Sequence, residues 1–226
     1  MPLFLLILIL SSCAARIDGS LSGDGSAVLS VKLLLEPRIT SLIRSLSAAG
    51  GQSGGNVLDG QAISKSMSAA PGIASVTFKN TAASSIEGQI KISDLNEFLS
   101  IAGKNFIVFE RNKQGGRCEI IINRDIGPVM LEQLSLEISD YLNALMAPIA
   151  SGEEMTKSEY LELVASFYNK SISDEIASSK IIASIDFPGN ITSVKGGTFS
   201  GRKANFNIPL LDLLVLETPA VYEVRW

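Results

Sequence analysis

The sequence predicts an α+β fold, mainly an antiparallel sheet of hairpins with several amphipathic helices packed on one of its faces. With 46% apolar and 19% charged residues among 226, the composition is that of a chain that buries a core. Short runs of strand-forming residues alternate with Gly, Asp and Pro turns, which indicates strands paired with their neighbours in sequence. Apolar residues at helical spacing between these runs indicate the helices. No shift in composition divides the chain, so residues 16–226 are expected to form a single domain.

The first half of the chain alternates predicted hairpins with short helices. Pro37 suits the first turn of a helix, and Asp94 is placed to cap a brief one. The Gly-rich segment at 50–56 is expected to be a flexible break. The elements expected here are a hairpin over 16–35, a helix from Pro37, a helix over 59–69, strands over 73–79 and 85–92, a helix over 95–102, and a hairpin over 105–123 that turns at 113–116.

The second half begins with predicted helices and ends in strands. The longest helix is expected over 128–147, where apolar residues recur at helical spacing. Thr156 and Glu159 have the spacing of a capping box, and the helix they begin should bury an apolar stripe of Tyr160, Leu163, Val164 and Phe167. Further elements expected are a short helix near Ser173 and strands over 181–187, 191–194, 198–210 and 220–226.

The amino terminus has the pattern of an export signal. Residues 3–10 are all Leu, Ile or Phe, whereas a membrane-spanning helix needs about 20 apolar residues. Ser11 and Ser12, which follow the apolar block, are small, as a cleavage site requires. The sequence therefore predicts a signal peptide over residues 1–12.

The residues Leu10-Ser11-Ser12-Cys13 resemble the lipobox of bacterial lipoproteins, although the basic residues that usually precede the apolar block are absent. The resemblance implies cleavage before Cys13 and a lipid anchor, with acyl groups such as palmitate, on that cysteine. Residues 13–20 would then form the lipidated tether and the start of the first strand. The partner implied is a membrane of the bacterial cell envelope, and the Ala14 that follows favours an outer membrane if the cell has one.

Cys118 is the second of the two cysteines in the chain. It alternates with Ile120 and Ile122, so its side chain is expected to point into the core, where free cysteines are commonly found. If Cys13 is acylated, no disulfide can form within the chain.

The search for catalytic motifs yields no catalytic residue, and we expect a protein that is not an enzyme. The chain has no histidine, which removes the usual general base. "GQSGG" at 51–55 matches a nucleophile elbow but follows a predicted helix and lies among small residues. Ser64 and Lys65 are adjacent and do not face each other on a helix. The carboxylate pairs at 153–154 and 174–175 lie near helix starts, where they complement the helix dipole.

Other classes of site are not indicated either. No metal-ligand spacing, phosphate loop or dinucleotide fingerprint is present, so no metal and no cofactor are expected. The formal net charge of −4 shows no footprint for nucleic acid.

Residues 187–226 resemble the end of the LppM-type envelope lipoprotein domain. The resemblance is carried by the turns at Pro188-Gly189, Gly196-Gly197 and Gly201, while Phe206 stands where that family often has tryptophan. It implies the same fold and an envelope location. For function it implies at most contact with a lipid or glycolipid.

Three functions follow as hypotheses. The first is a membrane-anchored, non-catalytic envelope lipoprotein that binds a lipid or an envelope protein or has a structural role. The second is a lipid or glycolipid carrier, in which the helices over 128–147 and 156–168 line an apolar cavity. The third is a hydrolase without histidine, which requires a lysine within hydrogen-bond reach of Ser64 or Ser53.

Overall fold

The computed structural model describes residues 13–49, 57–98, 100–101, 104–105, 107–112, 115–126 and 145–226. Its elements are β1 (Cys13–Leu21), β2 (Ala27–Leu35), α2 (Pro37–Ala49), α3 (Gly60–Ser68), β3 (Ile73–Ala82), β4 (Ser85–Ile92), α4 (Leu95–Phe98), β5 (Ser100–Ile101), β6 (Lys104–Asn105), β7 (Ile107–Asn112), β8 (Gly115–Ile122), the 3-10 turn η1 (Arg124–Ile126), α7 (Pro148–Ser151), α8 (Lys157–Phe167), α9 (Lys170–Ser178), β9 (Lys180–Asp186), β10 (Ser193–Lys195), β11 (Thr198–Ser200), β12 (Lys203–Pro209), α10 (Leu210–Val215) and β13 (Ala220–Arg225).

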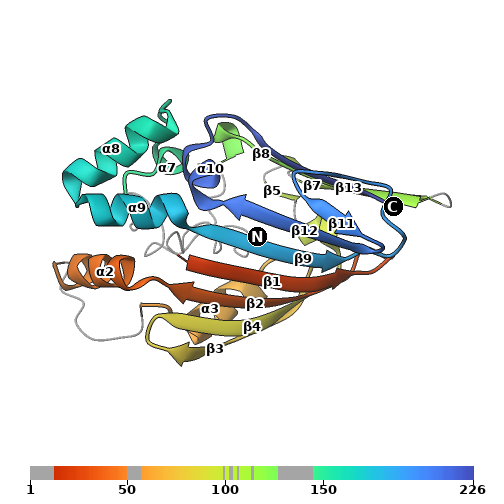
Figure 1. Cartoon of the computed structure of the whole chain (residues 1–226). Helices are drawn as coiled ribbons and strands as arrows, with labels where there is room; N and C mark the ends of the chain where they lie inside the picture. Colours follow the sequence, from red (N-terminus) through yellow and green to blue (C-terminus); the bar gives the residue numbers. More distant parts are fainter. Residues whose placement is uncertain are drawn as a thin grey trace.

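The strands form two main sheets, and the predicted α+β class is confirmed (Figure 1). The larger sheet has seven strands in the order β11-β12-β9-β1-β2-β4-β3, and the smaller has four in the order β10-β13-β8-β7. All their pairings are antiparallel except that of β1 with β9, which runs parallel from Ala14 opposite Lys180 to Ser20 opposite Asp186. Helices α2, α8 and α9 gather at one end of the larger sheet, and the smaller sheet lies beside it (Figure 1).

Each predicted hairpin between sequence neighbours is present. β1 pairs with β2 around the turn at residues 22–26, β3 pairs with β4, and β7 pairs with β8. In β4 the inward face carries Ile86, Ile90 and Ile92, which are all buried, as the alternation predicts. The last hairpin turns earlier than expected, because Gly115 and Gly116 already belong to β8 and pair with β7.

The predicted helix over 59–69 is confirmed as α3, which packs against the edge strand β3. Asp59 caps its start, and its carboxylate accepts hydrogen bonds from the amides of Gln61 and Ala62 at 2.9 and 3.1 Å. Asn80 of β3 accepts a hydrogen bond from the Gly60 amide and donates one to the Leu58 carbonyl. These contacts cover backbone groups of an edge strand that would otherwise be open to pairing with another chain.

The capping box predicted at Thr156 is present. The Thr156 hydroxyl accepts from the Glu159 amide at 3.2 Å, and the Glu159 carboxylate accepts from the Thr156 amide at 2.7 Å. Tyr160 and Val164 are fully buried, as the stripe predicts. Phe167 is 67% exposed, so the prediction was wrong at this position. It is the last residue of α8, and the apolar stripe of the helix does not continue beyond it.

Several stretches differ from the sequence prediction or lie outside the described residues. The helix expected over 95–102 ends at Phe98, and Ser100–Ile101 form strand β5. The single strand expected over 198–210 is a hairpin of β11 and β12 that turns at Gly201 and Arg202. It ends at Pro209 and is followed by helix α10, whose Leu213, Leu214 and Val215 are fully buried. A short apolar run of this kind cannot be assigned to helix or strand by periodicity alone. The helix predicted over 128–147 and the break predicted at 50–56 fall mainly on residues 127–144 and 50–56, outside the described residues.

Trp226 closes one end of the space between the sheets. Its ring lies 5.9 Å from that of Phe109 and 5.2 Å from that of Phe187, between centroids, and only 9% of the residue is exposed. Its amide and carbonyl pair with the carbonyl and amide of Gly116 at 3.0 and 2.8 Å. A Cβ on Gly116 would lie 2.2 Å from the indole ring, so glycine is required for this approach.

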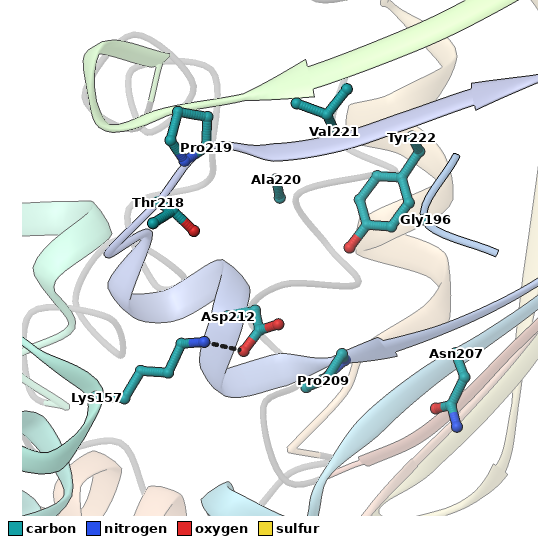
Figure 2. Close-up of a pocket in the computed structure, with 10 residues that line it drawn as sticks. All are labelled: Lys157, Gly196, Asn207, Pro209, Asp212, Thr218, Pro219, Ala220, Val221 and Tyr222. Atoms are coloured by element: carbon teal, nitrogen blue, oxygen red, sulfur yellow. Dashed lines mark ion pairs between the residues drawn. The ribbon is translucent and has the colours of Figure 1, made fainter. Parts of the chain in front are cut away.

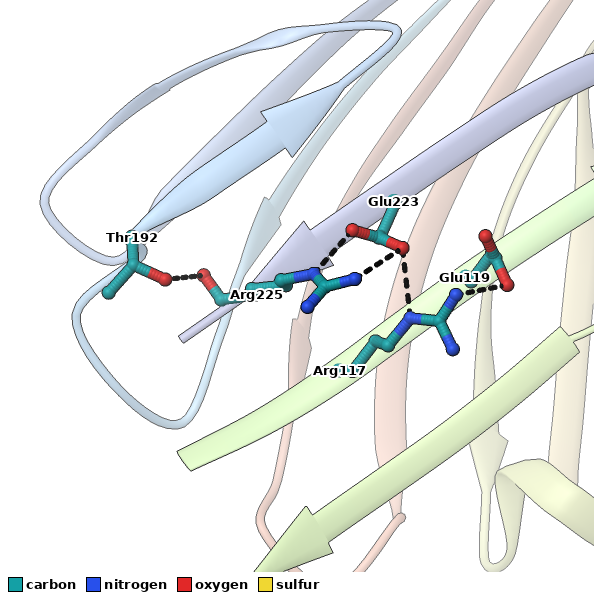
Figure 3. A network of polar contacts seen from close by, with 5 residues as sticks. All are labelled: Arg117, Glu119, Thr192, Glu223 and Arg225. Atoms are coloured by element: carbon teal, nitrogen blue, oxygen red, sulfur yellow. Dashed lines mark hydrogen bonds and ion pairs between the residues drawn. The ribbon is translucent and has the colours of Figure 1, made fainter. Parts of the chain in front are cut away.

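The outward face of the smaller sheet carries a network of two arginines and two glutamates (Figure 3). Glu223 accepts from Arg225 Nε at 2.6 Å and from Arg117 Nε at 2.9 Å, while Arg117 Nη2 also donates to Glu119 at 2.6 Å. The Thr192 hydroxyl donates to the Arg225 carbonyl at 3.2 Å. Hydrogen bonds from Arg225 and then Arg117 lower the pKa of Glu223 to about 2.

This lowered pKa predicts an acid-dependent loss of stability. Because folding lowers the pKa of Glu223 from 4.5 to about 2, its contribution is present above pH 4.5 and is lost as the pH falls toward 2. We expect Glu223→Gln to lower the free energy of unfolding at neutral pH by about 1 kcal/mol, as for a partly exposed ion-pair network.

Denaturant unfolding of both proteins from neutral to acidic pH measures this difference, which should shrink as the pH falls through that window. The matched control is Glu162→Gln, at an exposed glutamate of α8, which should leave the free energy of unfolding unchanged. A Glu223→Gln difference that stays constant with pH would contradict the assignment.

Candidate functional site

The structure places the predicted lipidation site at the start of the larger sheet. Cys13 is the first residue of β1, and its backbone lies opposite Leu35 of β2. The predicted signal peptide, residues 1–12, lies outside the described residues, and lipidation of Cys13 stays a prediction. Among the helices described, none has the length and apolar character needed to cross a membrane.

The candidate serines do not form a catalytic site in the described part of the chain. Ser64 uses its hydroxyl structurally: it donates to the Gly60 carbonyl and accepts from the Phe78 amide, both at 2.7 Å, and so fastens α3 to β3. Lys65 is exposed on the same helix. Ser53 and the "GQSGG" motif lie outside the described residues.

The carboxylate pairs also have structural contacts. Asp174 forms an ion pair with Lys170, and Glu175 accepts a hydrogen bond from the Ile39 amide. Glu154 pairs with Arg124, and Glu153 is exposed. Over the residues that the structure describes, no three Cys, Asp or Glu side chains gather in a way that could hold a metal ion.

An apolar cavity of about 170 Å³ lies between the two sheets, among the residues that the structure describes. Its exposed wall is entirely apolar. The larger sheet contributes inward-facing side chains of β1, β2, β9 and β12, the smaller sheet those of β8 and β13, and α4 and the segment after β9 close one end. The residues that line it are Ile17, Ser20, Leu21, Ala27, Leu29, Ile92, Leu95, Phe98, Cys118, Ile120, Ile181, Ala183, Ile185, Phe187, Phe206, Ile208, Tyr222 and Val224.

Strand alternation and small residues create this space. Ile181, Ala183 and Ile185 alternate along β9 and therefore point to the same side of the sheet. Gly19 of β1 lies opposite Leu29, and a Cβ there would come within 2.5 Å of the Leu29 side chain. Gly19 therefore leaves room for the Leu29 side chain, which lines the cavity, while Ala27 and Ala183 are small residues of the wall itself.

The cavity is chemically suited to hydrocarbon. A buried water needs two to four polar partners, which this wall does not offer. An apolar cavity of roughly 150 Å³ in another protein stays dry and takes up benzene or xenon. Its size admits a segment of a single acyl chain, and it holds no charged group to bind an ion.

Cys118 lies in the wall of this cavity, as its alternation with Ile120 and Ile122 predicts for a core position. The residue keeps some accessible surface, and this surface faces the cavity. Burial raises the pKa of the Cys118 thiol to about 12, because the thiolate would have to exist in apolar surroundings.

A second, polar pocket of about 280 Å³ lies beside the first cavity (Figure 2). Lys157 of α8 and Asp212 of α10 form an ion pair in it, with 2.7 Å between Nζ and Oδ1. The hydroxyl of Tyr222 and the carboxylate of Asp212 point toward the same space (Figure 2). Burial and the negative charge of Asp212 raise the pKa of Tyr222 to about 12. Asn207, Pro209, Thr218 and Pro219 complete most of the lining.

The two spaces share one wall. Tyr222 lines both of them, and its ring meets that of Phe206 edge-on, with 5.8 Å between centroids and an interplanar angle of 89°. Gly196 and Gly197 lie against this pair: a Cβ on Gly196 would come within 2.7 Å of the Tyr222 ring, and one on Gly197 within 2.6 Å of the Phe206 ring. The glycines that the sequence marks as a turn thus also pack the aromatic pair.

The sequence matches no model of a known protein family and no curated protein. Among solved structures, the chain is similar to the folded domain of the LppM protein of Mycobacterium tuberculosis, determined by NMR. The two have 11% sequence identity and a TM-score of 0.40, over 95% of this chain and 89% of that domain. The fold resembles that domain, but a similarity of this degree carries neither a ligand nor an activity to this chain.

In the carrier hypothesis, helices over 128–147 and 156–168 line an apolar cavity. The described cavity lies between the sheets and takes none of its lining from 156–168, while residues 127–144 lie outside the described residues. The apolar face of β8 was visible in the sequence as the alternation of Cys118, Ile120 and Ile122. Its partner Tyr222 was not, because only folding brings β13 beside β8.

The buried thiol gives a test of the cavity wall. We expect Cys118 to react with iodoacetamide on the order of a thousandfold more slowly in the folded chain than in denaturant, because raising its pKa from 9.0 to about 12 depletes the thiolate. The measurement uses a Cys13→Ser chain, in which Cys118 is the one thiol, with mass spectrometry to follow alkylation. Equal rates in the folded and unfolded chain would show that Cys118 is not in an apolar wall.

Proposed function

We propose that this protein binds the hydrocarbon chain of a lipid between its two sheets and is held at a bacterial envelope membrane by acyl groups on Cys13. The observation that supports this proposal most directly is the entirely apolar cavity of about 170 Å³. In this proposal the protein binds and does not catalyse, since the described candidate Ser64 is used in packing and lies outside the cavity.

The energetics favour a filled cavity. Protein interiors are close-packed, and an empty apolar volume of about 170 Å³ costs about 4 kcal/mol at roughly 24 cal/mol per Å³. A hydrocarbon chain that enters the space restores these contacts, and each buried methylene contributes about 0.8 kcal/mol. The volume is below the 300–1,000 Å³ of typical small-molecule sites, so part of one chain is the expected occupant.

The proposed anchor places the domain close to the bilayer. Because β1 begins at Cys13, an acyl group on this residue would be attached directly to the start of a central strand of the larger sheet, without a long linker. Two or more acyl chains give stable membrane attachment. The lipobox-like residues before Cys13 and the Ala14 after it support an envelope location, with the outer membrane favoured where one exists.

A larger side chain inside the cavity should weaken lipid binding. We expect Ala183→Leu to weaken the binding of the fluorescent fatty acid cis-parinaric acid at least tenfold, since the added carbons occupy the space of the chain. The matched control is Ile182→Phe, which adds volume at the neighbouring residue on the outer face of β9, where Ile182 is 41% exposed. Fluorescence titration measures both. If Ala183→Leu folds normally and binds the probe as tightly as the parent chain, the cavity is not the binding site. The same conclusion follows if neither the parent chain nor Ala183→Leu binds the probe.

The anchor has a separate test. Cells that express the full chain and are fed an alkyne-tagged palmitate should label it, and the labelled protein should sediment with membranes. Cys13→Ala should lose both the label and the sedimentation, while Cys118→Ala, the matched control at the other cysteine, should keep both. Labelling that survives Cys13→Ala would contradict the lipoprotein assignment.

A further inference from the structure

We propose that the polar pocket binds the uncharged, hydroxylated head of the lipid whose chain enters the apolar cavity, so that the two spaces form one site for a single-chain amphiphile. This inference rests on the proposed function, because it requires a chain in the cavity. It adds the class of ligand, the residues that recognise its head, and the place where the chain enters.

The first support is the residue Tyr222, which lines both spaces. Tyr222 carries its ring in the wall of the apolar cavity and its hydroxyl toward the polar pocket (Figure 2). An amphiphile has the same division, with an apolar chain joined to a polar head. Tyr222 therefore stands where the junction between chain and head would lie.

The larger sheet has an unpaired strand edge beside the polar pocket. β11 pairs with β12 only from Lys203 to Asn205, so among the described residues the outer edge of β12 from Phe206 to Pro209 has no strand partner. β13, which faces it across the polar pocket, belongs to the other sheet. The Phe206–Tyr222 pair lies between the two spaces there, and in this proposal the chain enters where these two side chains move apart.

The polar groups of the pocket suit a head with hydroxyls. Thr218 and Tyr222 offer hydroxyls that donate and accept. The rings of Pro209 and Pro219 supply apolar surface beside these groups, against which the carbon atoms of a polyol can pack. The volume of about 280 Å³ is sufficient for a glycerol-sized head.

The charges of the pocket favour an uncharged head. The ammonium of Lys157 is already paired with the carboxylate of Asp212 at 2.7 Å, so the two charges compensate each other. The backbone amide of Lys157 donates to Glu217, which adds a further negative group nearby. A phosphate in this pocket would meet the Asp212 carboxylate, and a quaternary ammonium would meet Lys157 and find no aromatic cage.

The test compares three probes on the full chain carrying Cys13→Ser. These are monolaurin, whose head is glycerol; lauryl phosphate, which has the same chain and an anionic head; and dodecane, which has no head. We expect monolaurin to bind at least tenfold more tightly than lauryl phosphate in calorimetric titration. Thr218→Val and Tyr222→Phe should each weaken monolaurin binding about three- to tenfold, the loss expected for one hydrogen bond, and leave dodecane binding unchanged.

The matched control is Thr198→Val, the same exchange on β11 outside the pocket, which should change no affinity. If none of the probes binds, the proposed function fails and this inference fails with it. If dodecane and monolaurin bind alike, and Thr218→Val and Tyr222→Phe weaken neither, the cavity function stands and the head-group assignment is wrong. Tighter binding of lauryl phosphate than of monolaurin would also overturn it.

Discussion

The parallel pairing of β1 with β9 is the constraint on which the rest of this structure depends. It joins the antiparallel group β2, β4 and β3 to the group β12 and β11, and so makes one sheet from segments at opposite ends of the chain. Its register places Ile17 beside Ala183 and Gly19 beside Ile185. Parallel strands cannot be joined by a tight turn, and the chain between them here includes β2 to β8 and helices α7 to α9.

The cavity follows from this pairing and from the smaller sheet that faces it. Because side chains alternate along a strand, the joined sheet directs one continuous apolar face inward. The facing strands β8 and β13 supply Cys118, Ile120 and Val224, and Trp226 closes one end against Phe109 and Phe187. Gly19 leaves room for the Leu29 side chain in the wall, and the small residues Ala27 and Ala183 keep the space open where larger ones would fill it.

The charged groups are distributed so that the inner and outer faces of β13 have different roles. Outward, Glu223 and Arg225 join Arg117 in a compensated network that ties β13 to β8. Inward, Val224 and Tyr222 face the apolar cavity, and the Tyr222 hydroxyl meets the polar pocket at the open edge of the larger sheet. The one strand therefore contributes both to the stability of the smaller sheet and to the boundary between the two spaces.

The sequence by itself determined many local elements: the hairpins β1–β2, β3–β4 and β7–β8, the caps at Asp94 and Thr156, and the inward direction of Cys118. Each of these depends on residues close together in the chain. It also carried the lipobox-like pattern at Cys13, whose role remains a prediction. Helix α10 and the exposure of Phe167 were not predicted from the sequence, because a short apolar run does not show what it packs against. Only the tertiary structure decided the pairing of β1 with β9, the second sheet and the position of Tyr222 between two cavities. These depend on contacts between residues distant in sequence, and no local pattern encodes which distant strand a given strand will meet.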